Sequence, residues 1–213
     1  MRKVSIGIRI GRNAQIATNV VIGAGGKDLG ELVIGNNAII RSGSVIYYGS
    51  KIGDNFKTGH NAVIREHNNI GNNVSVGSLA ELNVNNQIGN YSSIHYGCFL
   101  ERVKIGEYCF IAPGVIFLDD LLPVDPNPLD WKGAIVGNNV VIGGRSVVNP
   151  WIVIGSNVLI GSGSVITKNI PDGEVWFGNP AKHRGYVKNL KYRDGDSGYI
   201  PGNWIRVNRG YKK

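Results

Sequence analysis

The chain has 213 residues, is 42% hydrophobic and carries a net charge of +8 at neutral pH. This length and apolar content suffice for one extended hydrophobic core. No apolar run approaches the roughly 20 residues that a membrane-spanning helix needs, and the first residues lack the apolar core of a secretion signal. Much of the positive charge lies between Lys182 and Lys213, without a recognition-helix pattern or an RNA-binding aromatic motif. We therefore expect a cytoplasmic protein that binds neither a membrane nor a specific nucleic acid.

An aliphatic residue recurs at nearly every sixth position along the chain. The period runs from Ile34 to Leu100, resumes from Ile105 to Phe117, and returns from Val136 to Ile166. A six-residue period predicts a solenoid in which three hexads form one 18-residue coil with three flat faces. We expect an all-β, parallel β-helix of about eight coils, which begin near Ile10, Ile34, Ile52, Ile70, Ile88, Ile105, Val136 and Ile154.

Small and polar residues mark the inward slots and corners of these coils. Cys98 and Cys109 each follow a repeat aliphatic by four residues, where other hexads place Ala or Ser. We expect both cysteines to fill the core without a disulfide or a metal. Asn pairs such as Asn36-Asn37 fall at corners, where Asn tolerates the left-handed backbone conformation.

Three interruptions break the period. They are a Gly-rich segment at 25–31, a one-residue deletion between Leu100 and Ile105, and a long excursion at 118–133. Because each coil rests only on its neighbours, such insertions cost little stability and can carry function. The repeats are expected to end near Ile166, in a repeat domain spanning residues 1–184. Residues 185–213 are expected to form a basic, irregular tail.

Two groups of motifs resemble those of a known family. The segment from Val136 to Pro171, followed by Gly178-Asn179-Pro180-Ala181-Lys182, is similar to the C-terminal signature of the left-handed β-helix (hexapeptide-repeat) acyltransferases. Residues 57–66 (KTGHNAVIRE) and 117–123 (FLDDLLP) resemble the subgroup that acylates amino sugars, often nucleotide-linked ones.

This resemblance implies left-handed coiling, a homotrimer with active sites between subunits, and acetyl-coenzyme A as the acyl donor. It also implies a set of cofactor-binding residues. The backbone at Gly144 and Ser162 would bond the pantetheine amides, Thr167 and Lys168 match the "TK" of the signature, and Arg184 lies near the nucleotide end. Cationic Lys168 and Arg184 suit phosphates, although both could also be solvated charges on an end face.

Histidine and carboxylate side chains are the candidates for the chemistry, because attack of an amine on a thioester needs a proton acceptor. His95 stands in a column that other coils fill mainly with Gly or Ala, and His60 stands in the neighbouring column. Adjacent coils lie about 4.8 Å apart, which places the two histidines roughly 10 Å apart. His60 could instead make a corner hydrogen bond. His67 is expected at the surface of another corner, and His183 in the tail.

Asp119 and Asp120 stand where the resembled subgroup carries Asn-Asp, in a loop where other members carry a histidine base. An Asp there could bind an ammonium group or accept its proton, given enough desolvation to raise its pKa. The alternative interpretation is a pair of carboxylates that cap backbone groups of the loop.

The favoured function is acetyl-coenzyme A dependent N-acetylation of an amino sugar, with a nucleotide-linked acceptor in glycan precursor synthesis. The alternatives are O-acetylation of a sugar or small alcohol, a scaffold without catalysis, and a γ-carbonic anhydrase. The last needs two histidines separated by four residues, whereas His60 and His67 have six between them. We expect no metal site.

Overall fold

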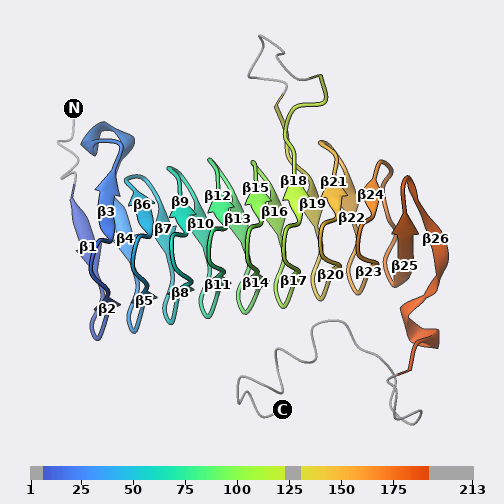
Figure 1. Ribbon diagram of the computed structural model, residues 1–213, viewed down its shortest axis with the longest axis horizontal. Helices are drawn as coiled ribbons and strands as arrows, with labels where there is room; N and C mark the ends of the chain where they lie inside the picture. The colour runs from blue at the N-terminus through green and yellow to red at the C-terminus, as the bar shows by residue number, and fades with distance from the viewer. Residues whose placement is uncertain (1–6, 123–130, 192–213) are drawn as a thin grey trace.

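The computed structural model describes residues 7–122 and 131–191, which form an elongated three-sided prism (Figure 1). Successive strands pass in turn through three sheets, here called sheets A, B and C, and pair in parallel with the strand one coil away. Sheet A contains β1 (Ile8–Ile10), β4 (Leu32–Ile34), β7 (Lys51–Ile52), β10 (Asn69–Ile70), β13 (Gln87–Ile88), β16 (Lys104–Ile105), β19 (Ile135–Val136) and β22 (Val153–Ile154).

The other two faces follow the same order. Sheet B contains β2 (Gln15–Ile16), β5 (Ile39–Ile40), β8 (Lys57–Thr58), β11 (Ser75–Val76), β14 (Ser93–Ile94), β17 (Phe110–Ile111), β20 (Val141–Ile142), β23 (Leu159–Ile160), β25 (Glu174–Gly178) and β26 (Ala181–Tyr186). Sheet C contains β3 (Val21–Ala24), β6 (Val45–Tyr47), β9 (Val63–Ile64), β12 (Glu81–Leu82), β15 (Phe99–Leu100), β18 (Ile116–Phe117), β21 (Val147–Val148) and β24 (Val165–Ile166).

The six-residue period works because it turns one aliphatic per face into the prism. Ile70 pairs with Ile52 and Ile88, and all three are at most 3% exposed. The chain turns between faces through residues with positive φ, such as Asn37 (57°), Asn73 (59°) and Asn139 (55°). The predicted all-β, left-handed β-helix of eight coils is confirmed, as is the burial of both cysteines.

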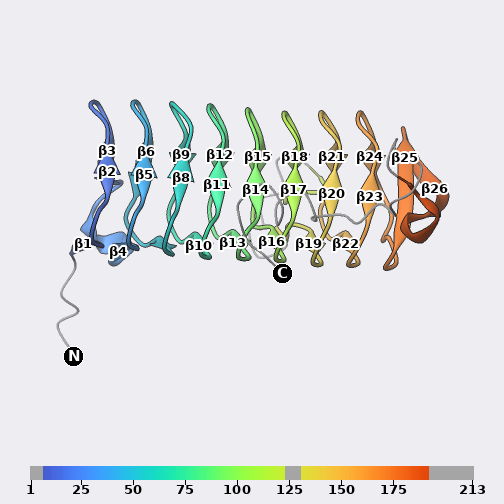
Figure 2. The same cartoon turned by 90° about the horizontal axis from the view of Figure 1, so that it is seen from below.

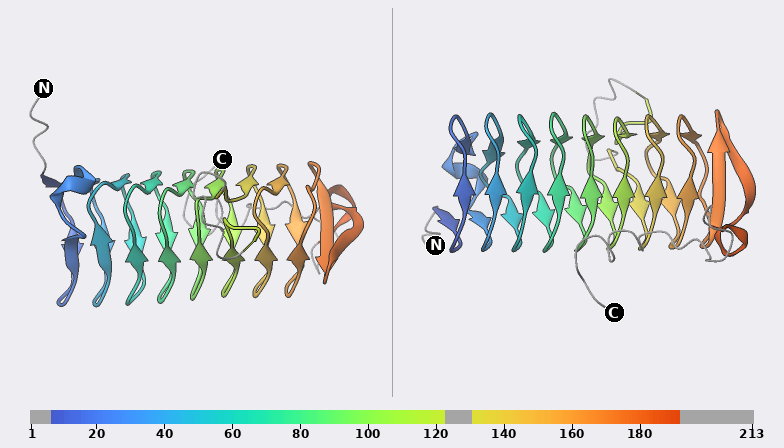
Figure 3. Two further views of the ribbon diagram at one scale, coloured as in Figure 1. Left: turned by 90° about the horizontal axis from the view of Figure 1, so that it is seen from above. Right: turned by 60° about the horizontal axis from the view of Figure 1, so that its bottom comes forward.

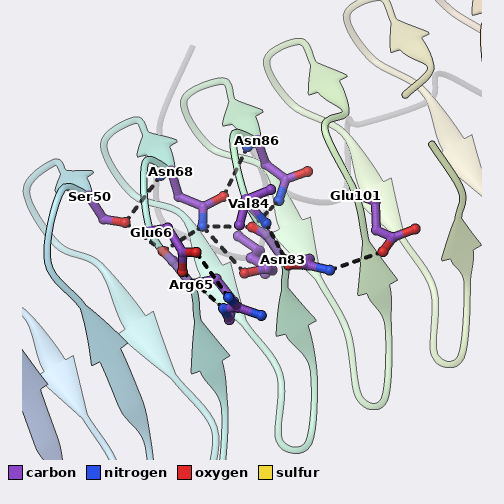
Figure 4. A network of polar contacts seen from close by, with 9 residues as sticks. Ser50, Arg65, Glu66, Asn68, Asn83, Val84, Asn86 and Glu101 are labelled. Carbon is purple, nitrogen blue, oxygen red and sulfur yellow. Dashed lines mark hydrogen bonds and ion pairs between the residues drawn. The ribbon is translucent and has the colours of Figure 1, made fainter. Parts of the chain in front are cut away.

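A ladder of buried polar side chains stabilises the middle of the prism (Figure 4). Asn68 and Asn86 are at most 1% exposed and occupy one inward column in successive coils. The Asn86 amide donates to the carbonyl oxygens of Asn83 (2.8 Å) and Leu100 (3.2 Å), and its Oδ1 accepts from the Val103 N–H (2.9 Å). Asn68 Oδ1 accepts from the Asn86 N–H at 3.1 Å. The ladder satisfies backbone groups that would otherwise be buried without partners.

Two of the predicted interruptions project from the prism. The Gly-rich segment forms a short 3-10 turn, η1 (Lys27–Leu29), between β3 and β4. The excursion leaves between β18 and β19, where Figure 1 shows it standing away from the coils. Part of it, residues 123–130, lies outside the described residues.

The repeats continue past Ile166, where we expected them to end. Ile170 bridges Ile154 of sheet A, and β25 pairs with β23 to extend sheet B by a ninth, incomplete coil. Strand β26 then folds back antiparallel on β25, and this hairpin covers the C-terminal end (Figure 3). The hairpin was missed because it abandons the hexad period. It reaches Tyr186 and is followed by the 3-10 turn η2 (Val187–Asn189), while residues 192–213 lie outside the description.

No helix among the described residues is long and apolar enough to cross a bilayer.

Candidate active site

The predicted site residues lie on two edges of the prism. The BC edge consists of the turns that lead from sheet B to sheet C, such as residues 59–62 and 95–98, and it holds His60, His95, Gly144 and Ser162. The CA edge consists of the turns from sheet C to sheet A, and it holds Asp119, Asp120, Thr167 and Lys168. Sheet C separates the two edges. A single chain therefore does not bring His95 and Asp119 together.

His95 follows β14 directly, in register with Gly77 one coil earlier. Its backbone N–H donates to the Ile111 carbonyl oxygen at 2.9 Å, and its ring lies 4.3 Å from the Phe110 ring, centroid to centroid. The ring is only half-buried. The hydrogen bonds between coils fix the position of the His95 backbone, and the Phe110 ring packs against one side of the imidazole.

The outer surface of sheet B changes character at His95. The outward residues of the three nearest strands on the N-terminal side are Lys57, Ser75 and Ser93, with Ile39 one coil farther, and those on the C-terminal side are Phe110, Val141 and Leu159. Figure 2 shows the strands that carry them, β8, β11, β14, β17, β20 and β23, in one row. The imidazole thus stands at a boundary between a polar and an apolar strip.

A shallow groove of about 250 Å³ lies on the polar side of this boundary. It is lined by Arg41, Lys57, Thr58, Gly59, Ser75, Val76, Gly77, Ile94 and His95. Two larger grooves, of about 430 and 450 Å³, run along sheet A and contain none of the predicted site residues. Of these three grooves on the described residues, the smaller one contains a predicted site residue, His95.

His60 makes the corner hydrogen bonds that were its alternative interpretation. Its Nδ1 lies 2.8 Å from Ser42 Oγ, and its backbone N–H donates to Ser78 Oγ at 3.0 Å. These contacts tie three successive coils together. His67 is exposed at a corner with a φ of 60°, as predicted. His183 was expected in the tail but lies in β26, with its ring 5.0 Å from that of Tyr186.

Asp119 and Asp120 hold the base of the excursion. Asp119 is 7% exposed and accepts from Arg102 Nε at 2.9 Å, while its carbonyl oxygen accepts from the Lys132 N–H at 2.8 Å. Asp120 Oδ1 accepts from the Leu122 N–H at 2.8 Å. The Asp120 carboxylate thus makes the backbone contact of the capping interpretation, whereas the Asp119 carboxylate pairs with the Arg102 side chain.

Glu101 belongs to the same cluster and was missed by sequence reasoning. Burial is the main cause that raises its pKa, and the nearby charge of Asp119 raises it further, although a hydrogen bond from Asn83 opposes both. The Arg102 guanidinium lies over the Trp131 ring at 5.7 Å, and the buried Trp131 Nε1 has no hydrogen-bond partner in the part of the chain that the structure describes. Glu101 precedes the one-residue deletion, which was the only sequence signal for it.

The expected cofactor-binding residues lie toward the C-terminal end. The Gly144 carbonyl oxygen accepts from the Gly163 N–H at 2.8 Å, and Ser162, Thr167 and Lys168 are exposed. Arg184 is the extra residue of a bulge between β25 and β26, and its guanidinium lies 5.0 Å from the Phe177 ring centre. Bulges commonly re-aim a side chain. None of these residues lines any of the three grooves described above.

Among the described residues, no three His, Cys, Asp or Glu side chains gather where they could hold a metal ion.

Comparison with known families identifies the repeat. The family model described as bacterial transferase hexapeptide (six repeats) matches residues 133–168, and the model described as hexapeptide repeat of succinyl-transferase matches residues 3–24. Both matched segments carry the repeat of the hexapeptide transferases. The matches agree with the predicted family and with the predicted enzyme class, an acyltransferase.

Solved structures similar to this chain include the polySia-specific acetyltransferase NeuO, at 19% identity and a TM-score of 0.45, covering 96% of this chain and 94% of that one. The UDP-N-acetylglucosamine acyltransferase of Campylobacter jejuni is 17% identical, with a TM-score of 0.44 and coverage of 94% and 82%. A protein of Bacillus cereus described as a putative acetyltransferase is 19% identical, with a TM-score of 0.42 and coverage of 97% and 94%.

Proposed function

We propose that this transferase moves the acetyl group of acetyl-coenzyme A to the amine of an amino sugar, with a nucleotide-linked acceptor. The observation that carries the proposal is the position of His95, where the surface of sheet B changes from polar to apolar. An imidazole at such a boundary can face a polar acceptor on one side and an apolar acyl-pantetheine arm on the other. Use of acetyl-coenzyme A places the reaction in the cytoplasm.

The donor occupies the C-terminal side in this proposal. Phe110, Val141 and Leu159 form a half-buried apolar strip suited to the pantetheine arm. Backbone groups at Gly144 and Ser162 bond its amides. The exposed Thr167, Lys168 and Arg184 meet the phosphates, to which lysine and arginine donate charge-assisted hydrogen bonds.

The chemistry at the boundary is acyl transfer. The neutral amine attacks the thioester carbonyl carbon, a C–N bond forms, and the C–S bond breaks. His95 accepts the proton that the amine loses and returns it to the departing coenzyme A sulfur. Histidine suits this task because its charge ordinarily changes between pH 5 and 8.

In this proposal, Asp119 and Asp120 contribute to the active site of a neighbouring subunit in a homotrimer. Sheet C separates the CA edge from the BC edge within one chain. The cleft between two subunits would bring the CA edge of one copy to His95 of the next. Asp119, already paired with Arg102, would then face the ammonium form of the acceptor, and Asp120 would adjoin it.

A thiol-release assay tests the proposal, with acetyl-coenzyme A and a panel of nucleotide-linked amino sugars and their matched hydroxy sugars. We expect turnover with an amino sugar and a fall in kcat of about 10²- to 10⁴-fold in His95→Ala, the usual contribution of a general base. The exposed corner residue His67→Ala is the matched control and should retain activity.

Two outcomes would count against the proposal. Turnover that survives both His95→Ala and Asp119→Ala would rule out the proposed site. Turnover with the hydroxy sugars alone would indicate O-acetylation. Binding of acetyl-coenzyme A to each variant separates a chemical defect from a loss of fold.

A further inference from the structure

We propose that the groove on sheet B binds a phosphate group of the acceptor through Arg41 and Lys57. The inference rests on the proposed function and adds to it where the acceptor lies and which residues hold its anionic part. Lys57 begins the segment 57–66 on which the family resemblance rests, but the resemblance assigns no role to Lys57 or to Arg41.

Charge is the first argument. Arg41 and Lys57 are exposed, and none of the ion pairs found among the described residues involves either of them. None of the residues lining the groove is acidic. Two cations without a carboxylate partner at one groove form a site suited to a phosphate, to which arginine donates through its planar fork and lysine as a point charge.

The other grooves differ in this respect. The sheet A groove that contains Arg9 also contains Glu31, and these two side chains form an ion pair with a nitrogen–oxygen distance of 2.6 Å. The second sheet A groove contains Lys104 as its single cation, among Asn and Gln side chains. The sheet B groove alone among the three combines two uncompensated cations with a candidate proton acceptor.

Geometry is the second argument. Arg41, Gly59, Gly77 and His95 stand in one column, each following its sheet B strand in successive coils. Three coil steps of about 4.8 Å separate Arg41 from His95 by about 14 Å along the prism, and two steps separate Lys57 from the coil of His95 by about 10 Å. Both intervening glycines, Gly59 and Gly77, line the groove between the cations and the imidazole.

The polar floor completes the site. Ser75 lines the groove between Lys57 and His95, and its Oγ lies 3.0 Å from Oγ of the buried Ser93. Hydroxyls can both donate to and accept from sugar hydroxyls. A sugar would therefore lie over Ser75, with its amine at His95 and its phosphate toward Lys57 and Arg41. The donor, on the apolar side of His95, would approach from the opposite direction.

Titration calorimetry with uridine diphosphate, inorganic pyrophosphate and coenzyme A tests this arrangement without requiring turnover. The test variant is Arg41→Gln/Lys57→Gln, and the matched control is Lys51→Gln/Lys104→Gln, which removes the same charge from exposed positions of sheet A. We expect the test variant to weaken uridine diphosphate or pyrophosphate binding about tenfold or more, because charge-assisted hydrogen bonds are lost. Coenzyme A binding should stay within about twofold in both variants.

The remaining outcomes would overturn the proposal. They are equal weakening in both variants, no effect in either, or no binding of either probe to the wild-type chain at millimolar concentrations. Loss of coenzyme A binding alone in the test variant would assign the phosphate to the donor. Absence of acetyl transfer despite retained phosphate binding would instead count against the proposed reaction and leave the groove assignment standing.

Discussion

At the scale of single residues, the inward column that holds Asn68 and Asn86 shows how a solenoid tolerates polar side chains inside. The same column is occupied by Ser50 one coil earlier and by Val103 one coil later. Each Asn exchanges hydrogen bonds with neighbouring backbone groups, so the cost of burying an amide is offset by bonds that an aliphatic side chain could not make.

The ladder leads to a stability prediction. Asn86→Ala removes two donated hydrogen bonds and one accepted bond at a site that is 0% exposed. We expect the free energy of unfolding in urea to fall by about 2 to 4 kcal/mol, the sum of unsatisfied polar groups and a small cavity. Asn69→Ala, on the exposed outer face of β10, is the control and should change it by less than about 0.5 kcal/mol. A loss below about 1 kcal/mol in Asn86→Ala would contradict the role of the ladder.

At the scale of elements, the excursion is anchored by a small charged cluster at its base. Asp119 pairs with Arg102, Arg102 lies over Trp131, and Glu101 shares the cluster with a raised pKa. The cluster joins the turn after β15 to the turn after β18. It therefore couples the geometry of the loop to that of the preceding coil.

The cluster predicts a pH-dependent stability. The pKa of Glu101 lies above its ordinary value of 4.5, mainly because of burial and next because of Asp119. A protonated Glu101 is compatible with folding. Its contribution to the free energy of unfolding is therefore complete below pH 4.5 and is lost as the pH rises through the folded-state pKa. Glu101→Gln should therefore raise the free energy of unfolding near pH 7 by a few tenths to about 1 kcal/mol, after allowance for solvent screening.

Urea unfolding at neutral pH and below pH 4.5 measures this effect. The gain from Glu101→Gln should vanish in acid, where wild-type Glu101 is already neutral. The control Glu107→Gln removes a carboxylate that accepts a hydrogen bond from Asn90 in the preceding coil, and should give no comparable gain at neutral pH. A gain from Glu101→Gln that is equal at both pH values would contradict the titration of this carboxyl.

Sequence reasoning was most successful where the period itself carries the information. The coils, the corner asparagines and the buried cysteines all follow from which hexad position each residue occupies. The β25–β26 hairpin could not be predicted in this way, because it leaves the period. Glu101 and the pair of Arg41 and Lys57 were missed for another reason, since their importance depends on neighbours in other coils. The expected roles of His95 and Asp119 remain predictions.

At the scale of the whole molecule, the three faces differ in polarity. The outward residues at the middle of sheet A are Lys51, Asn69, Gln87 and Lys104, all exposed. Those of sheet C are half-buried and mostly apolar, namely Val45, Val63, Glu81, Phe99, Ile116, Val147 and Val165. A face of this kind is suited to contact between copies, which the proposed homotrimer requires.

The proposed assembly predicts a mass in solution. Size-exclusion chromatography with light scattering should give three times the chain mass of 23.0 kDa. Val147→Glu, in the apolar column of sheet C, should shift the mass toward that of one chain, because a carboxylate buried at an interface is costly. Lys104→Glu on sheet A serves as the control and should leave the trimer intact. A wild-type mass of one chain would refute the assembly.

The in-register pairing of the coils has a consequence for how such a molecule can change over time. Equivalent positions along one edge are separated by whole multiples of about 4.8 Å. Gain or loss of one 18-residue coil between Arg41 and His95 would change the distance between these two residues by about 4.8 Å. The surroundings of each residue would stay the same. The length of ligand that the two residues can span would therefore change in steps of one coil.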